Sequence, residues 1–105
     1  MIKDREKAFE NKFAHDEAML FKAAARRNKL LGIWASEKLG KCEDGTKKYT
    51  MEVIESDFEE AGDDDVLRKV YADFKDAGIE VNKEEIRRQM DYLLGIAKQE
   101  VMEEV

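Results

Sequence analysis

The two arginines of the run ARRNK are the side chains of this sequence best suited to hold an anion. An arginine guanidinium presents paired N–H groups that match a carboxylate or a phosphate. On a helical projection Arg27 falls between Ala24 and Leu31, within an apolar stripe where an unpaired charge would be costly to bury. Arg27 therefore needs a partner, which is either an acid of the same chain in an internal ion pair or a bound anion. The sequence has no glycine-rich phosphate loop, so side chains would have to hold any phosphate.

Other residue patterns predict little further chemistry. His15 is the only histidine and is the candidate pH sensor, because its unperturbed pKa lies near neutrality; the alternative is an exposed histidine paired with a nearby acid. No second His or Cys stands at ligand spacing, so we expect no metal site. The run ESDFEEAGDDD does not fit the calcium-binding EF-hand loop and is better explained as a turn and a helix start. Without a catalytic triad or a cofactor fingerprint, we expect no catalytic residues and no enzyme.

Composition favours a small helical protein. The chain has 105 residues, enough for one domain, and 42% of them are charged while none is proline, a mixture typical of long helices with solvated outer faces. No strand-like alternation occurs. The single cysteine, Cys42, excludes an internal disulfide and fits a reducing cytosol. The charged first residues contain no secretory signal, and nothing approaches the ~18 apolar residues of a membrane span.

Charge is distributed unevenly along the chain. Residues 1–50 hold 12 basic and 8 acidic residues, a net +4, and residues 51–105 hold the remaining 7 and 17, a net -10, which together give the overall -6. The basic half suits an acidic surface or an anionic ligand. We do not expect nucleic acid as a partner, because the acidic half would repel phosphates.

Glycines divide the chain into four predicted helices, which must position these side chains. The predicted helices run from about Asp4 to Leu39, from about Thr46 to Glu60, from Asp63 to Ala77, and from Asn82 nearly to the end. Apolar stripes support the third helix at Val66, Leu67, Val70, Phe74 and Ala77, and the fourth at Ile86, Met90, Leu93, Leu94, Ala97 and Val101. The second helix is ambiguous, with Tyr49 and Val53 on one side and Met51, Ile54 and Phe58 on another. Short connections between amphipathic helices predict an all-α four-helix bundle.

The first predicted helix is too long for this bundle. About 36 residues would reach ~54 Å, whereas the second and third helices would reach only ~22 Å. One stripe can face the other helices, namely Leu20, Ala24, Leu31, Trp34 and Ala35. Phe9 and Phe13 lie further out on that stripe, beyond Asp16, with basic rim residues at Lys3, Arg5, Lys7 and Lys12. We therefore predict a mobile arm over residues 1–17 that binds another protein, and a bundle over residues 18–105. The alternative is that the two phenylalanines fold back on the bundle or pair in a homodimer.

Several long runs carry a family resemblance. The runs DREKAFENKFAHDE, KAAARRNKLLGIWASEKLG, DFEEAGDDDVLRKV and IRRQMD, in that order, resemble the zeta subunit of alphaproteobacterial F-type ATP synthases, an ATPase inhibitor protein. The resemblance covers nearly the whole chain. One departure is Ala61, where the family pattern usually has proline, which leaves the turn before Gly62 less rigid.

The resemblance implies a regulatory function. Zeta subunits are small four-helix proteins that inhibit ATP hydrolysis by inserting the N-terminal segment at a catalytic interface between alpha and beta subunits. The expected partners are therefore the alpha, beta and gamma subunits of the catalytic head, with Arg5, Phe9, Lys12 and Phe13 in the inhibitory arm. The expected location is the cytoplasm, peripheral to the inner membrane through the ATP synthase, without membrane insertion and as a monomer when free.

The family also binds adenine nucleotide without known turnover, which implies bound ATP or ADP as a ligand and no required cofactor. The resemblance supports a phosphate site at Arg26, Arg27 and Arg87, with Trp34 near the base. Arg87 borders the apolar stripe of its helix and Arg88 points away, so these two arginines cannot share one role. The alternative function is a nucleotide-sensing helical adaptor that acts on a different partner.

Overall fold

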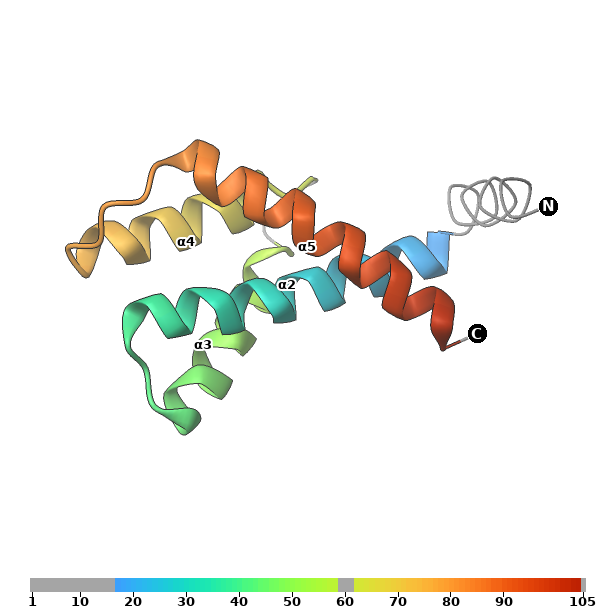
Figure 1. Ribbon diagram of the computed structural model, residues 1–105, viewed down its shortest axis with the longest axis horizontal. Coiled ribbons are helices and arrows are strands. Elements are labelled where there is room, and N and C mark those ends of the chain that lie inside the picture. The colour runs from blue at the N-terminus through green and yellow to red at the C-terminus, as the bar shows by residue number, and fades with distance from the viewer. Residues whose placement is uncertain (1–16, 59–61, 105) are drawn as a thin grey trace.

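The computed structural model describes residues 17–58 and 62–104, which form helices and no strand (Figure 1). The elements are α2 (Glu17–Leu39), α3 (Glu43–Ser56), α4 (Asp64–Asp76) and α5 (Lys83–Glu103). The all-α prediction is confirmed for these residues, and α2, with 23 residues, is the longest helix among them. The predicted arm falls outside the described residues, except for Glu17 at the start of α2.

Helix α2 is the central element of the fold. It packs most extensively against α3 and α5, and α4 contacts the other three helices. Figure 1 shows α3 and α4 gathered beside the C-terminal half of α2, while the N-terminal half of α2 lies beside the C-terminal end of α5. Among the described residues, α2, α3, α4 and α5 meet at a thicker end, which we call the four-helix end, and α2 and α5 form a thinner end, which we call the two-helix end.

Two hydrophobic clusters follow from this arrangement. The larger cluster lies at the four-helix end and contains Leu31, Ala35, Tyr49, Val53, Val66, Val70, Phe74, Ile86, Met90 and Leu93. The smaller cluster lies at the two-helix end, between α2 and α5, and contains Met19, Ala23, Ala97 and Val101. Most of the predicted apolar stripes are confirmed, but Ala77 is exposed because α4 ends at Asp76. Leu20, Ala24 and Trp34 are only partly buried, whereas the neighbouring Met19 and Ala23 are buried in the smaller cluster.

The second helix begins three residues earlier and ends four residues earlier than the sequence predicted. The observed helix begins at Glu43, where Glu43 and Asp44 place negative charge beside the helix N-terminus, and it ends at Ser56. Its buried side carries Tyr49 and Val53, whereas Met51 is 55% exposed. The sequence ambiguity is thereby resolved in favour of the Tyr49 side.

The last helix begins at Asn82, its N-cap residue, as the sequence predicts. The Asn82 side chain accepts a hydrogen bond from the backbone N–H of Glu85 at 2.8 Å, which satisfies a donor that the helix itself leaves unpaired. At the preceding turn Gly78 adopts φ 74°, and the backbone N–H of Ile79 donates to the carbonyl of Phe74 at 2.9 Å. This left-handed conformation explains why glycine ends α4.

A close backbone approach holds α3 against α2. A Cβ atom added to Gly32 would lie 2.8 Å from the Cα atom of Thr50, closer than packed atoms tolerate. Glycine at this position therefore lets the two helices pack tightly and fixes where α3 sits along α2.

Candidate functional site

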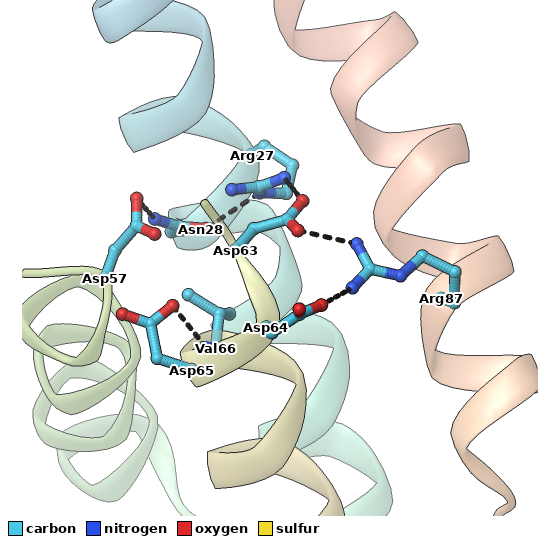
Figure 2. A network of polar contacts seen from close by, with 8 residues as sticks. All are labelled: Arg27, Asn28, Asp57, Asp63, Asp64, Asp65, Val66 and Arg87. Carbon is cyan, nitrogen blue, oxygen red and sulfur yellow. Dashed lines mark hydrogen bonds and ion pairs between the residues drawn. The ribbon is translucent and has the colours of Figure 1, made fainter. Parts of the chain in front are cut away.

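A connected set of polar and charged side chains joins the helices (Figure 2). At its centre is Asp63, immediately before α4. One carboxylate oxygen of Asp63 accepts from Arg27 Nη1 at 3.0 Å, and the other accepts from Arg87 Nη1 at 2.8 Å. Arg87 also donates through Nη2 to Asp64 at 2.7 Å. Two arginines from α2 and α5 thus converge on one carboxylate at the N-terminus of α4.

The same network reaches α3 through an asparagine. Arg27 Nε donates to Asn28 Oδ1 at 2.8 Å, and Asn28 Nδ2 donates to Asp57 Oδ2 at 3.0 Å. Asp57 directly follows the last residue of α3. The contacts of these residues therefore connect α2, the end of α3, the start of α4, and α5 in one chain of hydrogen bonds, which we call the Arg27–Asp63 network.

Burial makes the partners of Arg27 important. Arg27 is only 3% exposed and Asn28 only 1%, although both are polar. A buried guanidinium without a carboxylate would leave an uncompensated charge in a poorly solvated place. Asp63 supplies that carboxylate, so the internal ion pair considered from the sequence is present.

The environment shifts the pKa values of Asp57 and Asp63 in opposite directions. Burial raises the pKa of Asp57 above the ordinary aspartate value, against the hydrogen bond from Asn28 and the charge of Arg27, which lower it. Burial also acts to raise the pKa of Asp63, but the hydrogen bonds and charges of Arg87 and Arg27 outweigh it and lower that pKa. Asp63 is consequently held ionised, whereas ionisation of Asp57 is disfavoured.

Chemically, this arrangement is an anion site whose anion is a carboxylate of the chain itself. Two guanidinium groups that share two oxygens form the pattern that also binds a phosphate. A phosphate would have to displace Asp63 to reach both arginines. Among the described residues, no group of His, Cys, Asp and Glu is placed to hold a metal ion.

The structure separates the predicted nucleotide residues into three places. Arg27 and Arg87 meet in the network. Arg26 instead pairs with Glu100 of α5 at 3.4 Å and with Glu104, which directly follows α5. Trp34 stacks edge-on against Phe74, with ring centroids 5.6 Å apart. Arg26 and Trp34 therefore have contacts distinct from those of the arginine pair.

The predicted arm and pH-sensing residues cannot be placed. Arg5, Phe9, Lys12, Phe13 and His15 all lie outside the described residues. Their roles remain predictions from the sequence.

Sequence analysis did not single out Asn28 and Asp57 as members of the network. An asparagine beside an arginine carries no periodic signal. The sequence predicted a helix start at Asp63, and Asp63 does occupy the N-cap position, but its side chain makes no capping hydrogen bond and binds the arginines instead. A usable signal was present: a buried arginine on α2 and a second arginine on α5 both require acids, and Asp63 precedes a helix that packs on both.

Comparison with known proteins agrees with the helical architecture. The family model described as ATPase inhibitor subunit zeta matches residues 1–100. A solved relative, a solution NMR structure of a protein, is 45% identical and superposes with a TM-score of 0.72, covering 83% of this chain and 99% of that chain. No curated protein matches. In the residues that the structure describes, no helix has the length and apolar character needed to cross a membrane.

Proposed function

The chain belongs to the ATPase inhibitor subunit zeta family, and from this premise we propose that it inhibits ATP hydrolysis by inserting residues 1–17 at a catalytic interface of the ATP synthase. The interface lies between an alpha and a beta subunit, with the gamma subunit nearby. The protein acts in the cytoplasm, held at the inner membrane by the ATP synthase. The observation that carries the proposal is that the family match begins at residue 1 and therefore includes the whole N-terminal segment.

The chemistry of that segment supports a role in binding. Phe9 and Phe13 stand four residues apart, so a helix would present both phenyl rings on one side. Burying both in an apolar groove would contribute ~3–6 kcal/mol before the cost of ordering the segment. Arg5 and Lys12 would meet acidic groups at the rim of the groove.

The bundle supports the role of a scaffold. Among the described residues, the buried members of both hydrophobic clusters lie between Met19 and Val101. Residues 1–17 can therefore bind a partner while residues 18–105 keep a hydrophobic core of their own. His15, at the junction, is the residue that would make inhibition depend on pH.

A nucleotide site is the second part of the proposal. ATP or ADP would place its phosphates at Arg27 and Arg87, whereas Arg26 and Trp34, which the resemblance also implied, have other partners in the structure. The convergence of two guanidinium groups on Asp63 supports this location, because a phosphate can replace a carboxylate there. The alternative, a nucleotide-sensing adaptor with a different partner, would use the same site but not the ATP synthase.

Deletion of residues 1–17 tests the inhibitory role. The shortened protein should no longer inhibit ATP hydrolysis by the ATP synthase, and its melting temperature should stay close to that of the full chain. The double variant Phe9→Ala and Phe13→Ala is the matched control for charge, because it removes the rings and keeps the basic residues. Full inhibition by the shortened protein would contradict the proposed role of residues 1–17, whereas a full chain that does not inhibit the ATP synthase would favour the adaptor alternative.

A further inference from the structure

The guanidinium group of Arg27 is held at two points by two different side chains. Its Nη1 donates to the carboxylate of Asp63 at 3.0 Å, and its Nε donates to Oδ1 of Asn28 at 2.8 Å. Arg27 and Asn28 are consecutive residues of α2, and both are buried. Figure 2 shows the Asn28 amide between the Arg27 guanidinium and the Asp57 carboxylate. A phosphate that took the place of Asp63 would not have to displace Asn28.

The orientation of the Asn28 amide is set by its two partners. An asparagine side chain has one end that donates and one end that accepts hydrogen bonds. Asp57 Oδ2 accepts from Asn28 Nδ2 at 3.0 Å, and Arg27 Nε, which can only donate, bonds to Oδ1. Exchange of the two ends of the amide would set two acceptors against each other at Asp57 and two donors against each other at Arg27. A single orientation therefore satisfies both partners.

Each arginine of the network has one contact that does not depend on Asp63. Arg87 donates through Nη2 to Asp64 at 2.7 Å, and Arg27 donates through Nε to Asn28. Both contacts would stay if a phosphate replaced the Asp63 carboxylate. For Arg27 this matters more, because its side chain is buried and a guanidinium released there would be costly to leave without a partner.

We propose that Asn28, oriented by Asp57, is a positioning residue of the nucleotide site: it keeps the Arg27 guanidinium in place while a phosphate occupies the position of the Asp63 carboxylate. This inference rests on the proposed nucleotide site. Asn28 contacts Arg27 and Asp57 rather than the phosphate itself, so its effect on affinity passes through the arginine. An arginine that is already fixed loses less conformational freedom when it binds a ligand.

The acids around the two arginines make this positioning important. Asp64 stays bound to Arg87, and Asp57 is separated from Arg27 by Asn28 alone. Both carboxylates repel a phosphate, so net charge cannot supply strong binding at this place. The affinity for ATP is therefore modest and depends on how well the donor groups of the two arginines are held in position.

The test compares two variants of the full chain that change the two ends of this contact. Asn28→Leu keeps the branched shape of the side chain and removes both of its hydrogen bonds. Asp57→Asn is the matched control, because it removes the charge and keeps an acceptor for Asn28 Nδ2. ATP is the probe. The readouts are its dissociation constant by calorimetry and the exchange of the Arg27 Nε–H proton with solvent by NMR, with melting temperatures measured in parallel.

We expect the Arg27 Nε–H proton of the parent to exchange slowly both without and with ATP, because the hydrogen bond to Asn28 persists when Asp63 is displaced. Asn28→Leu should bind ATP about tenfold more weakly than the parent. Asp57→Asn should bind ATP at least as tightly as the parent, because it keeps the orientation of Asn28 and removes a repelling charge.

Equal affinities of Asn28→Leu and the parent would overturn this inference and leave the nucleotide site standing. Equal weakening by Asp57→Asn and Asn28→Leu would also overturn it, because the charge of Asp57 would then be the feature that matters. Loss of slow Nε–H exchange in the parent on addition of ATP would overturn it without any variant, and so decides the matter even if Asn28→Leu does not fold. A parent chain that binds no ATP at millimolar concentration would remove the nucleotide site together with this inference, whereas the inhibitory role of residues 1–17 has its own assay.

Discussion

Asp63 stands at the N-cap position of α4, yet its carboxylate binds Arg27 of α2 at 3.0 Å rather than its own helix. The consequence is that a residue placed to start a helix serves to hold that helix against a neighbour. The first turn of α4 is left with Asp64 and Asp65 as the acids beside its N-terminus.

Replacing Asp63 by asparagine should destabilise the bundle. Arg27 would lose its carboxylate while remaining buried, and Arg87 would lose one of its two. We expect a loss of ~2–3 kcal/mol in the free energy of unfolding, less than the ~3–5 kcal/mol of a fully buried pair because the Asp63 side chain is partly solvated. Urea unfolding measures this change. The control is Asp64→Asn, which should cost less than about 0.5 kcal/mol because the Asp64 side chain is largely exposed.

Replacing Asp57 by asparagine should stabilise the protein at neutral pH, in contrast to the replacement of Asp63. Burial raises the pKa of Asp57, so the folded protein gains stability when this group takes up a proton, as the pH falls through its folded pKa. The amide of the variant is uncharged at every pH and keeps an acceptor for Asn28. The variant should therefore unfold at a higher urea concentration than the parent at pH 7, and this advantage should shrink toward the pH range where an ordinary aspartate titrates.

In the parent protein, Asp63 should make the free energy of unfolding depend on pH in the direction opposite to Asp57. Its pKa is lowered by the two arginines, so its contribution to stability is present above the ordinary aspartate pKa and is lost as the pH falls through the lower folded pKa. Unfolding of the Asp63→Asn variant should accordingly depend less on acid than that of the parent. Equal acid dependence in the two proteins would show that the ion pairs do not persist in solution.

Two glycines should respond in opposite ways to alanine. At Gly32 the added Cβ would press on the Thr50 backbone, so Gly32→Ala should destabilise the protein by about 1–3 kcal/mol. At Gly95, within α5, an added Cβ meets nothing, so Gly95→Ala should stabilise it by about 0.5–1 kcal/mol through helix propensity. Thermal unfolding of both variants checks the pair, and a destabilised Gly95 variant would contradict the open surface seen there.

Nucleotide binding makes a distinct prediction about Asp63. If the phosphates of ATP occupy the two guanidinium groups, they compete with this carboxylate, and Asp63→Asn should bind ATP more tightly than the parent. Titration followed by NMR should then shift resonances of Arg27 and Arg87. Tightening without movement at these two residues would place the nucleotide elsewhere, and no binding at millimolar ATP would remove the nucleotide from the proposal.

Periodicity predicted the helices well, because each buried face repeats along one element: Ile86, Met90 and Leu93 are buried as their spacing indicates. It also identified Arg27 as a charge that needs a partner. It could not choose between Asp63 and a bound anion, since that choice depends on how α4 docks on α2. The start of α3 was misplaced because the helix was predicted to begin after Gly45, although Glu43 and Asp44 before that glycine suit a helix N-terminus.

The division of the fold into a thicker and a thinner end implies unequal protection of its backbone amides from exchange with solvent. The thinner end relies on the small cluster at Met19 and Ala97 and on the partly exposed ion pairs of Arg26. Such a segment opens without unfolding the rest, since few buried contacts must break. Amides near Val101 should exchange faster than those near Phe74, and added salt should widen the difference by screening Arg26. The end of the bundle that carries the arm would then be the softer one, able to adjust its angle while the four-helix end stays rigid.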